Sequence, residues 1–382
     1  METLHQSQSI SIQQGCPQSK LEICGGREYK AETDEFYRQV NAHLAEMFWQ
    51  YVKMLVEKGW IDREEVYVNG TKIESKANRY TFVWRKTVER LLVKIRDRVR
   101  ELLELESGYA TKGKLRESIE ELEEEISAEG LSALKGRGHH KPEKIRKRDE
   151  EKELLERWES YEQKKEILGE KRNSYSKTDP DATFMHMKDD HMRNGQLKPG
   201  YNVQFAVNSQ FIVGLGVFAD RTDYATLPPI LNALKDHLGF CFEKVVADSG
   251  YESLENYRYL DENGQDAFIK PMNYETSKTK KFKGQIGRAE NMAYFRQGKY
   301  YLCKDGRILA MVGTTTEHGK DGTTREVAKY RCEDCSNCPH RAACCKVKDP
   351  NNPKELSVCR EFAQFREAAL NRITTEEGKL LR

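Results

Sequence analysis

The period of the apolar positions changes several times along the chain, and each change predicts a different element. Between Asp34 and Gly59 apolar residues recur every three or four positions, which predicts an amphipathic helix whose stripe packs in the core. Residues 66–73 instead alternate between apolar and polar, and they contain Asn69 followed by Gly70, a strong turn signal. We therefore expect a strand that has Asn69 at its end.

Residues 85–172 carry three further stripes of helical period, which are separated by glycines. Basic and acidic side chains are almost equally numerous at residues 141–172. This balance is typical of solvated helical faces joined by ion pairs between positions i and i+4, and not of a DNA-binding stripe. The pattern predicts a charged helical-hairpin insertion that acts as a scaffold.

After Pro180 the period becomes two, and residues 201–207 and 211–218 predict a β-hairpin. The pattern then predicts a helix, a strand, a second helix and a second strand, at residues 227–238, 244–247, 254–260 and 267–269. Elements in this order pack as a mixed sheet with helices on its faces, so the sequence predicts an α/β fold. In such sheets, ligands bind where the strands end.

Composition sets the limits of this interpretation. A length of 382 residues predicts two or three domains, and a net charge of +2 indicates no partner by itself. The chain has no run of 18 apolar residues, which argues against a transmembrane helix, and its polar start argues against a secretory signal. We therefore expect a cytoplasmic protein without membrane contact. In that reducing compartment, ten cysteines serve as metal ligands or free thiols.

Polar residues at the ends of predicted strands are the first candidates for chemistry. Asp248 follows the buried strand at residues 244–247, where a carboxylate can meet a ligand; an Asx turn or a helix cap is the alternative. Asn69 ends the earlier strand in a similar way, so we expect the two side chains to lie close together. Asp223 precedes a predicted helix and is interpreted as its N-cap.

A cysteine cluster is the second candidate. Two overlapping C-x₂-C steps are typical of a metal knuckle, and they predict a tetrahedral Zn²⁺ site. The expected ligands are Cys332, Cys335, Cys338 and Cys344. One of them could be replaced by Cys303, Cys345 or His340, and a set of unligated thiols is the alternative.

A basic segment is the third candidate, because residues 278–288 hold five cations and no acid. The pattern predicts contact with a phosphate backbone, and a solvated basic loop is the alternative. The five cations are Lys278, Lys280, Lys281, Lys283 and Arg288.

Several motifs in order resemble a family of bacterial insertion-sequence transposases of the DDE superfamily, from about residue 34 to the end. They are Asn69–Glu74, Tyr80–Trp84, Lys177–Ala182, His186–Lys188, Gly200–Gln204, Val246–Glu252 and Ile269–Pro271. The resemblance implies a ribonuclease-H-like mixed sheet with a charged helical insertion and a small Cys-rich, zinc-ribbon-like insertion. We expect a disordered leader (1–33), a helix and first core strand (34–84), the helical insertion (85–175), the core (176–274), a basic and Cys-rich insertion (275–365) and the start of a C-terminal segment (366–382).

The resemblance also implies a site in which two Asp and one Glu hold Mg²⁺ or Mn²⁺ for phosphoryl transfer on DNA. Asp248 matches the second Asp, whereas Asn69 stands where the family has the first. Asn69 is neutral and offers a metal one weaker oxygen. The family's Glu-bearing helix follows a segment like the one before Arg382, so we expect a copy truncated at both ends and inactive. Asp181 is a candidate substitute carboxylate.

The predicted function is that of a DDE transposase polypeptide for DNA transposition, from a degenerate or incomplete copy. One alternative is a non-catalytic DNA- or protein-binding remnant that keeps the zinc module, and another is a metal-dependent nuclease of the same fold. The expected partner is duplex DNA at the ends of the element, and a homodimer is left open. We expect the protein to associate with the nucleoid in the bacterial cytoplasm.

Overall fold

The computed structural model describes residues 43–105, 110–132, 141–170, 172–187, 195–319, 322–347, 349 and 352–382. The chain divides into two compact units, and the first contains residues up to Thr71, Val203–Phe218 and Thr222–Arg382. The second contains Lys72–Asn202 and Ala219–Arg221. The predicted disordered leader at residues 1–33 lies outside the described residues. The predicted division into six segments is finer than these units and stays a prediction.

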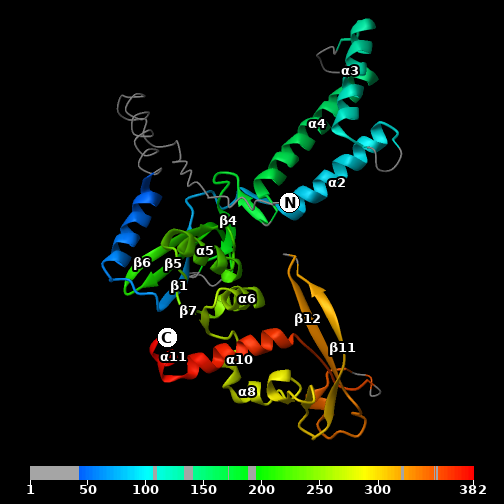
Figure 1. Cartoon of the computed structure of the whole chain (residues 1–382). Coiled ribbons are helices and arrows are strands. Elements are labelled where there is room, and N and C mark those ends of the chain that lie inside the picture. The colour runs from blue at the N-terminus through cyan, green and yellow to red at the C-terminus, as the bar shows by residue number, and fades with distance from the viewer. Residues whose placement is uncertain are drawn as a thin grey trace, which may run out of the picture. The chain divides into compact units, whose positions relative to one another are not determined.

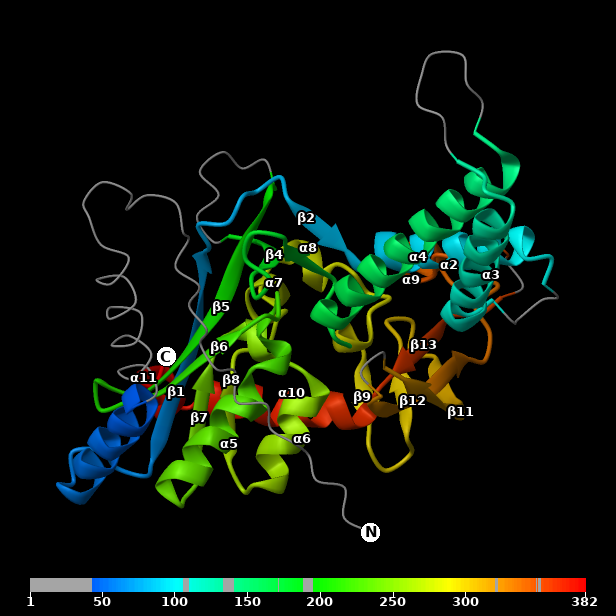
Figure 2. The same cartoon turned by 90° about the horizontal axis from the view of Figure 1, so that it is seen from above.

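A six-stranded mixed sheet has the order β4-β5-β1-β7-β8, with β6 paired to β5 (Figure 2). The sequence predicts five of these strands and misses β4. Strand β1 pairs in parallel with β7, and β7 pairs in parallel with β8. The strands are β1 (Glu65–Glu74), β4 (Thr183–His186), β5 (Leu197–Asn208), β6 (Phe211–Phe218), β7 (Lys244–Ala247) and β8 (Asp266–Ile269). The positive φ angles of Ser209 and Gln210 close the β5–β6 hairpin.

Helices of the first unit bury their apolar faces in one core with the strands. They are α5 (Leu227–Leu238), α6 (Leu254–Glu262), α10 (Arg360–Thr374) and the helical residues 43–57. The predicted stripe of this last helix, which included Met47, Phe48, Tyr51 and Leu55, is confirmed only in part, because Leu55 and Phe48 join the core and the other two do not. Val52 and Leu55 are fully buried, whereas Met47 and Tyr51 are 61% and 48% exposed. The sequence offers a broad apolar face, and only the edge that meets the sheet is covered.

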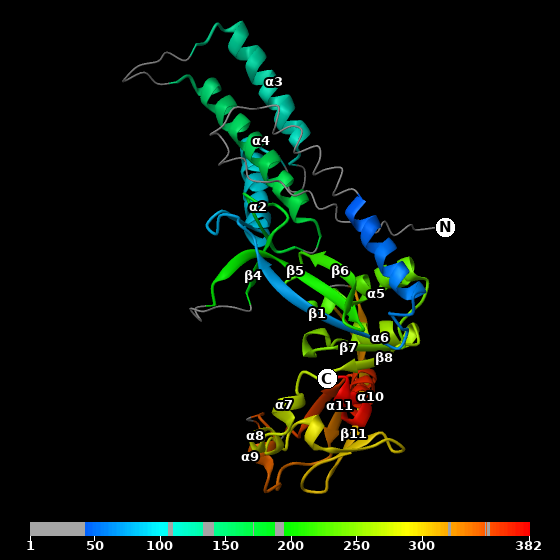
Figure 3. The same cartoon turned by 90° about the vertical axis from the view of Figure 1, so that its left-hand side faces the viewer.

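The second unit is built around three helices, as the stripes predict: α2 (Arg85–Leu102), α3 (Lys112–Ala128) and α4 (Glu143–Leu168). Helices α2 and α3 both contact α4 (Figure 3), and Leu92, Leu115 and Trp158 belong to their shared core. The short strands β2 (Phe82–Trp84) and β3 (Ser174–Ser176) pair beside them. Many of the ion pairs join different helices, so the balanced charge covers solvated faces between helices as well as along them.

A separate five-stranded sheet follows in the first unit, with the order β13-β12-β11-β10-β9 and a long β11–β12 hairpin (Figure 1). Its core contains Tyr301, Leu309, Tyr330 and the thiol of Cys332. The strands are β9 (Ala293–Phe295), β10 (Tyr300–Leu302), β11 (Ile308–His318), β12 (Thr324–Cys332) and β13 (Glu355–Val358). The short helices are α7 (Tyr274–Ser277), α8 (Lys280–Lys283), α9 (Arg341–Cys344) and α11 (Glu376–Leu380). In the described part of the chain, no helix is long and apolar enough to cross a membrane.

The Asn69-Gly70 pair is not a turn, which corrects the sequence-based interpretation. Strand β1 continues through it to Glu74, and the φ angle of Gly70 is not positive. A Cβ atom on Gly70 would lie 2.3 Å from Nε2 of Gln204, which no side chain could tolerate without a shift. The glycine therefore serves close packing between β1 and β5 and not chain reversal.

Candidate active site and cysteine-rich region

The register of two parallel strands places Asn69 beside Asp248. Val68 on β1 pairs with Ala247 on β7, and the two polar residues follow directly. Neighbouring strands lie about 4.8 Å apart, so the two side chains start from adjacent positions where β7 ends beside the middle of β1. Both residues are exposed. Asn69 and Asp248 are placed side by side because the alternating apolar residues of β1 and the apolar run of β7 pack in the same core sheet.

The Asp248 carboxylate also makes a local turn, as the alternative interpretation expects. Its Oδ1 accepts a hydrogen bond from the Gly250 N–H at 2.8 Å, which opens a short 3₁₀ turn over Ser249–Tyr251. This Asx-type geometry fixes the direction of the carboxylate at the end of β7. A turn and a ligand-binding role are compatible, because an ionised carboxylate has lone pairs on two oxygens.

Asp223 is not a helix N-cap, and that prediction is wrong. Thr226 takes the N-cap position of α5, and the Oδ1 of Asp223 accepts a hydrogen bond from Nε2 of Gln204 at 3.0 Å. The position that a Cβ on Gly250 would take lies 3.0 Å from Oδ2 of Asp223 and 3.0 Å from Oδ1 of Asp248. The two carboxylates therefore lie within about 6 Å of each other. The sequence signal that could have identified Asp223 as a site residue is its position soon after strand β6.

Gln204 links these groups from the middle of β5, where its side chain is fully buried. Besides donating to Asp223, it accepts a hydrogen bond from the Tyr251 hydroxyl. Burial, and next the charges of Asp223 and Asp248, raise the pKa of Tyr251, so the phenol stays protonated and donates. Sequence reasoning did not identify Gln204 as a site residue, because the alternation of a β-strand does not show what a buried polar side chain would bond.

Asp181 lies in the other unit, near the half-buried guanidinium of Arg172. Burial lowers the pKa of Arg172, and the nearby charge of Asp181 opposes this shift. Its neighbour Asp179 accepts hydrogen bonds from the hydroxyls of Ser75 and Tyr201. Asp179 thus has a structural role, and the substitution of Asp181 for a missing carboxylate stays a prediction.

The basic segment divides into two groups. Lys280, Lys281 and Lys283 are exposed on α8, and none of them forms an ion pair with another described residue. Lys278 instead pairs with Glu275 at 3.3 Å and lies 3.7 Å from the centre of the Tyr274 ring. Arg288 likewise stacks on the ring of Phe282, at 4.7 Å, and it lies 3.8 Å from Glu290.

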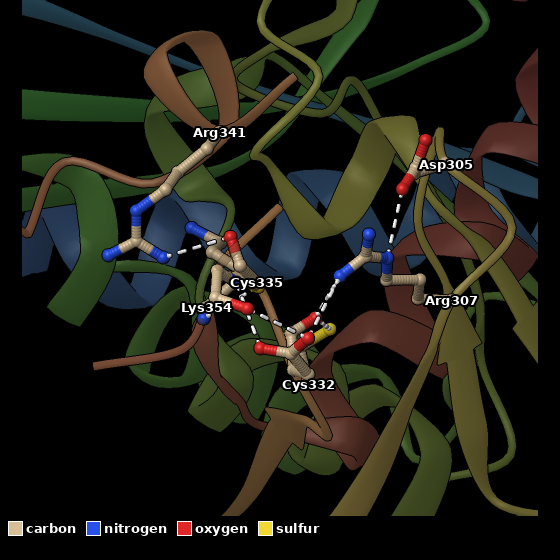
Figure 4. A network of polar contacts seen from close by, with 8 residues as sticks. Asp305, Arg307, Cys332, Cys335, Arg341 and Lys354 are labelled. Atoms are coloured by element: carbon tan, nitrogen blue, oxygen red, sulfur yellow. Dashed lines mark hydrogen bonds and ion pairs between the residues drawn. The ribbon is translucent and has the colours of Figure 1, made fainter. Parts of the chain in front are cut away.

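Two of the four predicted zinc ligands, Cys332 and Cys335, lie at the end of β12. Cys332 and Cys335 are buried, and the backbone N–H of Lys354 donates to Sγ of Cys335 at 3.4 Å (Figure 4). Sγ of Cys332 donates to the Asp334 carbonyl at 3.4 Å, and that carbonyl also accepts a hydrogen bond from Arg307 at 2.7 Å. A polar network therefore holds the knuckle in place.

Further thiols lie near this knuckle. Burial and then the neighbouring Cys335 raise the pKa of Cys332 to about 12, and Cys303 adds to the shift. Burial also raises the pKa of Cys344, with further contributions from Cys303, Cys335 and Cys338. Among the residues that the structure describes, no group of three or more His, Cys, Asp or Glu side chains has the arrangement of a metal site.

Comparison with protein families assigns most of these residues to one domain. Two family models, each described as a transposase DDE domain, match residues 172–334 and 302–382. Together they cover more than half of the chain, including Asp248 and the cysteine cluster, and the chain belongs to the DDE transposases of insertion sequences. No curated protein and no solved structure matches the chain. Asn69 precedes the matched residues, so its assignment depends on the strand register.

Proposed function

We propose that this transposase-family chain acts on duplex DNA, with a divalent-metal site where β1 and β7 bring Asn69 and Asp248 together. The observation that supports the proposal most is the register of these two parallel strands, because it places the amide and the carboxylate at adjacent positions. The family match supports DNA as the substrate class. Strand cutting and joining is the reaction that follows for a complete site of this kind.

The metal implied by the family is Mg²⁺ or Mn²⁺, and the donor set suits such an ion. Asp248 and Asp223 offer carboxylate oxygens that lie within about 6 Å of each other, and Asn69 offers an amide oxygen. Hard divalent cations prefer oxygen ligands of this type. When bound, the metal would act as a Lewis acid on a phosphoryl oxygen. The chain's own residues hold and orient it.

Asn69 should make this site weak. Replacement of a bridging carboxylate by a neutral amide removes one negative charge, which we estimate to cost about 3–5 kcal/mol, or about 10²–10⁴ in rate. We therefore propose that the chain binds DNA while cleavage is slow or undetectable. The neutral amide at position 69 also supports the proposal that the chain is a degenerate copy. A nuclease of the same fold remains the alternative if cutting occurs without strand joining.

The test of DNA binding uses fluorescence anisotropy with a labelled duplex over a salt series. Replacement of Lys280, Lys281 and Lys283 by Ala should reduce the slope of log K against log [salt] by about 2.7, because each lost phosphate contact removes about 0.9. The matched control replaces three exposed cations on α2 by Ala: Lys86, Arg90 and Lys94. Equal slopes in both triple variants would contradict the assignment of α8, and a wild-type chain that binds no duplex would contradict the function.

We also propose that one structural Zn²⁺, when it binds, draws Cys332, Cys335 and Cys344 together with Cys338 or Cys303 as the fourth ligand, since the described residues do not stand in the arrangement of a metal site without it. The N–H donated to Sγ of Cys335 supports this, since such bonds stabilise a metal-bound thiolate. Metal analysis under reducing conditions should find about one zinc per chain.

Single Cys→Ser variants would identify the fourth zinc ligand, because only the residue that binds the metal should reduce the zinc content when it is replaced. Cys241→Ser is the matched control, since Cys241 is another free cysteine that is not part of the cluster. A wild-type chain without zinc would overturn the proposal.

A further inference from the structure

Gln204 uses both ends of its amide in opposite directions. Its Nε2 donates to the carboxylate of Asp223 at 3.0 Å, and its Oε1 accepts from the hydroxyl of Tyr251. An amide side chain donates from its nitrogen and accepts at its oxygen, so it can serve two partners at once. The partners come from two separate segments, the turn before α5 and the turn after β7, so one buried side chain joins them.

The same amide also lies against β1. A Cβ on Gly70 would lie 2.3 Å from its Nε2 and 2.9 Å from its Cδ. Gly70 directly follows Asn69, so Gln204 packs on the backbone of β1 while it bonds the Asp223 carboxylate and Tyr251, which lies in the turn after Asp248. All of these residues belong to the first unit. Gln204 therefore contacts Asp223, the turn that follows Asp248, and the backbone of β1 beside Asn69.

We propose that Gln204 is a positioning residue of the metal site: it holds Asp223 and the Asp248–Tyr251 turn against β1 at Asn69. The inference rests on the function proposed above and names a residue outside the carboxylates of that site. Gln204 is fully buried, and the proposal gives it no direct contact with the metal. It acts through the placement of the carboxylates, as outer-shell partners of metal ligands generally do.

The experiment measures Mn²⁺ binding by electron paramagnetic resonance in the full chain. Gln204→Met keeps the approximate volume and loses both hydrogen bonds. Gln265→Met is the matched control, because Gln265 is also buried, and its Nε2 donates to the Phe242 carbonyl at 2.8 Å. We expect Mn²⁺ affinity to fall at least tenfold in Gln204→Met. The control should stay within about twofold of wild type, although both variants lose some stability.

The outcomes separate this inference from the proposed function. If wild type binds Mn²⁺, Asp248→Asn abolishes binding, and Gln204→Met binds as well as Gln265→Met, the positioning role is wrong and the metal site stands. If wild type shows no binding that depends on Asp248, the metal site itself is wrong and the inference falls with it.

A double-mutant cycle of stability, which needs no metal, tests the packing of Gln204 on β1. Gly70→Ala should lower the urea midpoint in the wild-type background, and it should cost clearly less when combined with Gln204→Ala, because the clashing amide is then absent. Additive effects would overturn the contact on which the positioning role depends.

Discussion

A buried ion pair joins the turn after β7 to α10, and its loss should be among the most damaging single changes in the first unit. The Glu252 carboxylate is fully buried, and Arg366 donates to it from Nε at 2.7 Å and from Nη2 at 2.9 Å. The backbone N–H of Met272 donates to Oε2 at 2.8 Å. Burial and the charge of Glu252 raise the pKa of Tyr257, so its hydroxyl also donates, at 3.3 Å.

Arg366→Ala removes two of the four donors and leaves a buried carboxylate without its countercharge. Such changes cost about 3–5 kcal/mol. Because Arg366 is itself 26% exposed, water can reach part of the site, and we expect the lower end, about 3 kcal/mol. The assay is urea unfolding at neutral pH, followed by circular dichroism. Since α10 packs on β8, the loss should appear as a lower midpoint of the first unit.

An exposed pair between the turn after β9 and the same helix provides the control. Arg296 and Glu367 lie 2.8 Å apart, but their side chains are 67% and 53% exposed. Arg296→Ala should therefore cost less than about 1 kcal/mol. Equal effects of the two substitutions would refute the reasoning, because burial of the carboxylate is the only difference that it uses. The double variant Glu252→Gln with Arg366→Met should be less damaging than Arg366→Ala alone, since no unpaired charge remains.

Three further predictions concern the site and the second unit. Asn69→Asp should tighten Mn²⁺ binding at least tenfold by restoring a charged oxygen donor, measured by the same resonance titration, and unchanged affinity would count against a metal at this position. Leu115→Ala should cost about 2–5 kcal/mol in urea unfolding, because Leu115 is fully buried between the helices of the second unit. Glu151→Leu should raise stability at pH 8 by about 1–3 kcal/mol. Neither of the buried Glu151 oxygens has a hydrogen-bond partner of ordinary geometry among the described residues, and the nearby Ser118 favours the charged form only in part. Desolvation raises the pKa of Glu151, so the stability of the wild-type chain should fall as the pH rises from about 4.5 through the raised pKa, and the variant should lack this fall. The control is Glu153→Leu, because the Glu153 side chain is 69% exposed.

The elements of the core could be predicted where local signals agree with the period. Helix α5 has the predicted bounds, Leu227–Leu238, because Pro228 can begin a helix and Gly239, with a φ of 77°, can end one. Strand β7 also has its predicted bounds, since a short apolar run before an Asp fits a buried parallel strand. Pairing of β1 with β7 followed from the fold class and not from either segment alone.

The errors have a common cause, which is a local signal with two physical meanings. Asn-Gly predicts a turn when only neighbouring residues are considered, yet Gly70 is small because Gln204, far along the chain, occupies the space of its missing side chain. Asp223 has the position of an N-cap, yet its carboxylate accepts from the same distant amide. Neither partner could be inferred without the sheet that brings β5 against β1. The residues that sequence reasoning misjudged are therefore the ones that the proposed site uses together.

This convergence also bears on why an amide can occupy position 69 without loss of the fold. Asn69 is exposed on β1, and the contacts that hold this part of the strand come from Gly70 and from the pairing of Val68 with Ala247. Neither depends on the charge of residue 69. Asp223 and Asp248 are likewise held by Gln204 and by the turn at Gly250. The scaffold of the site is thus independent of its charge, so substitution at position 69 should change metal affinity while stability stays within about 0.5 kcal/mol.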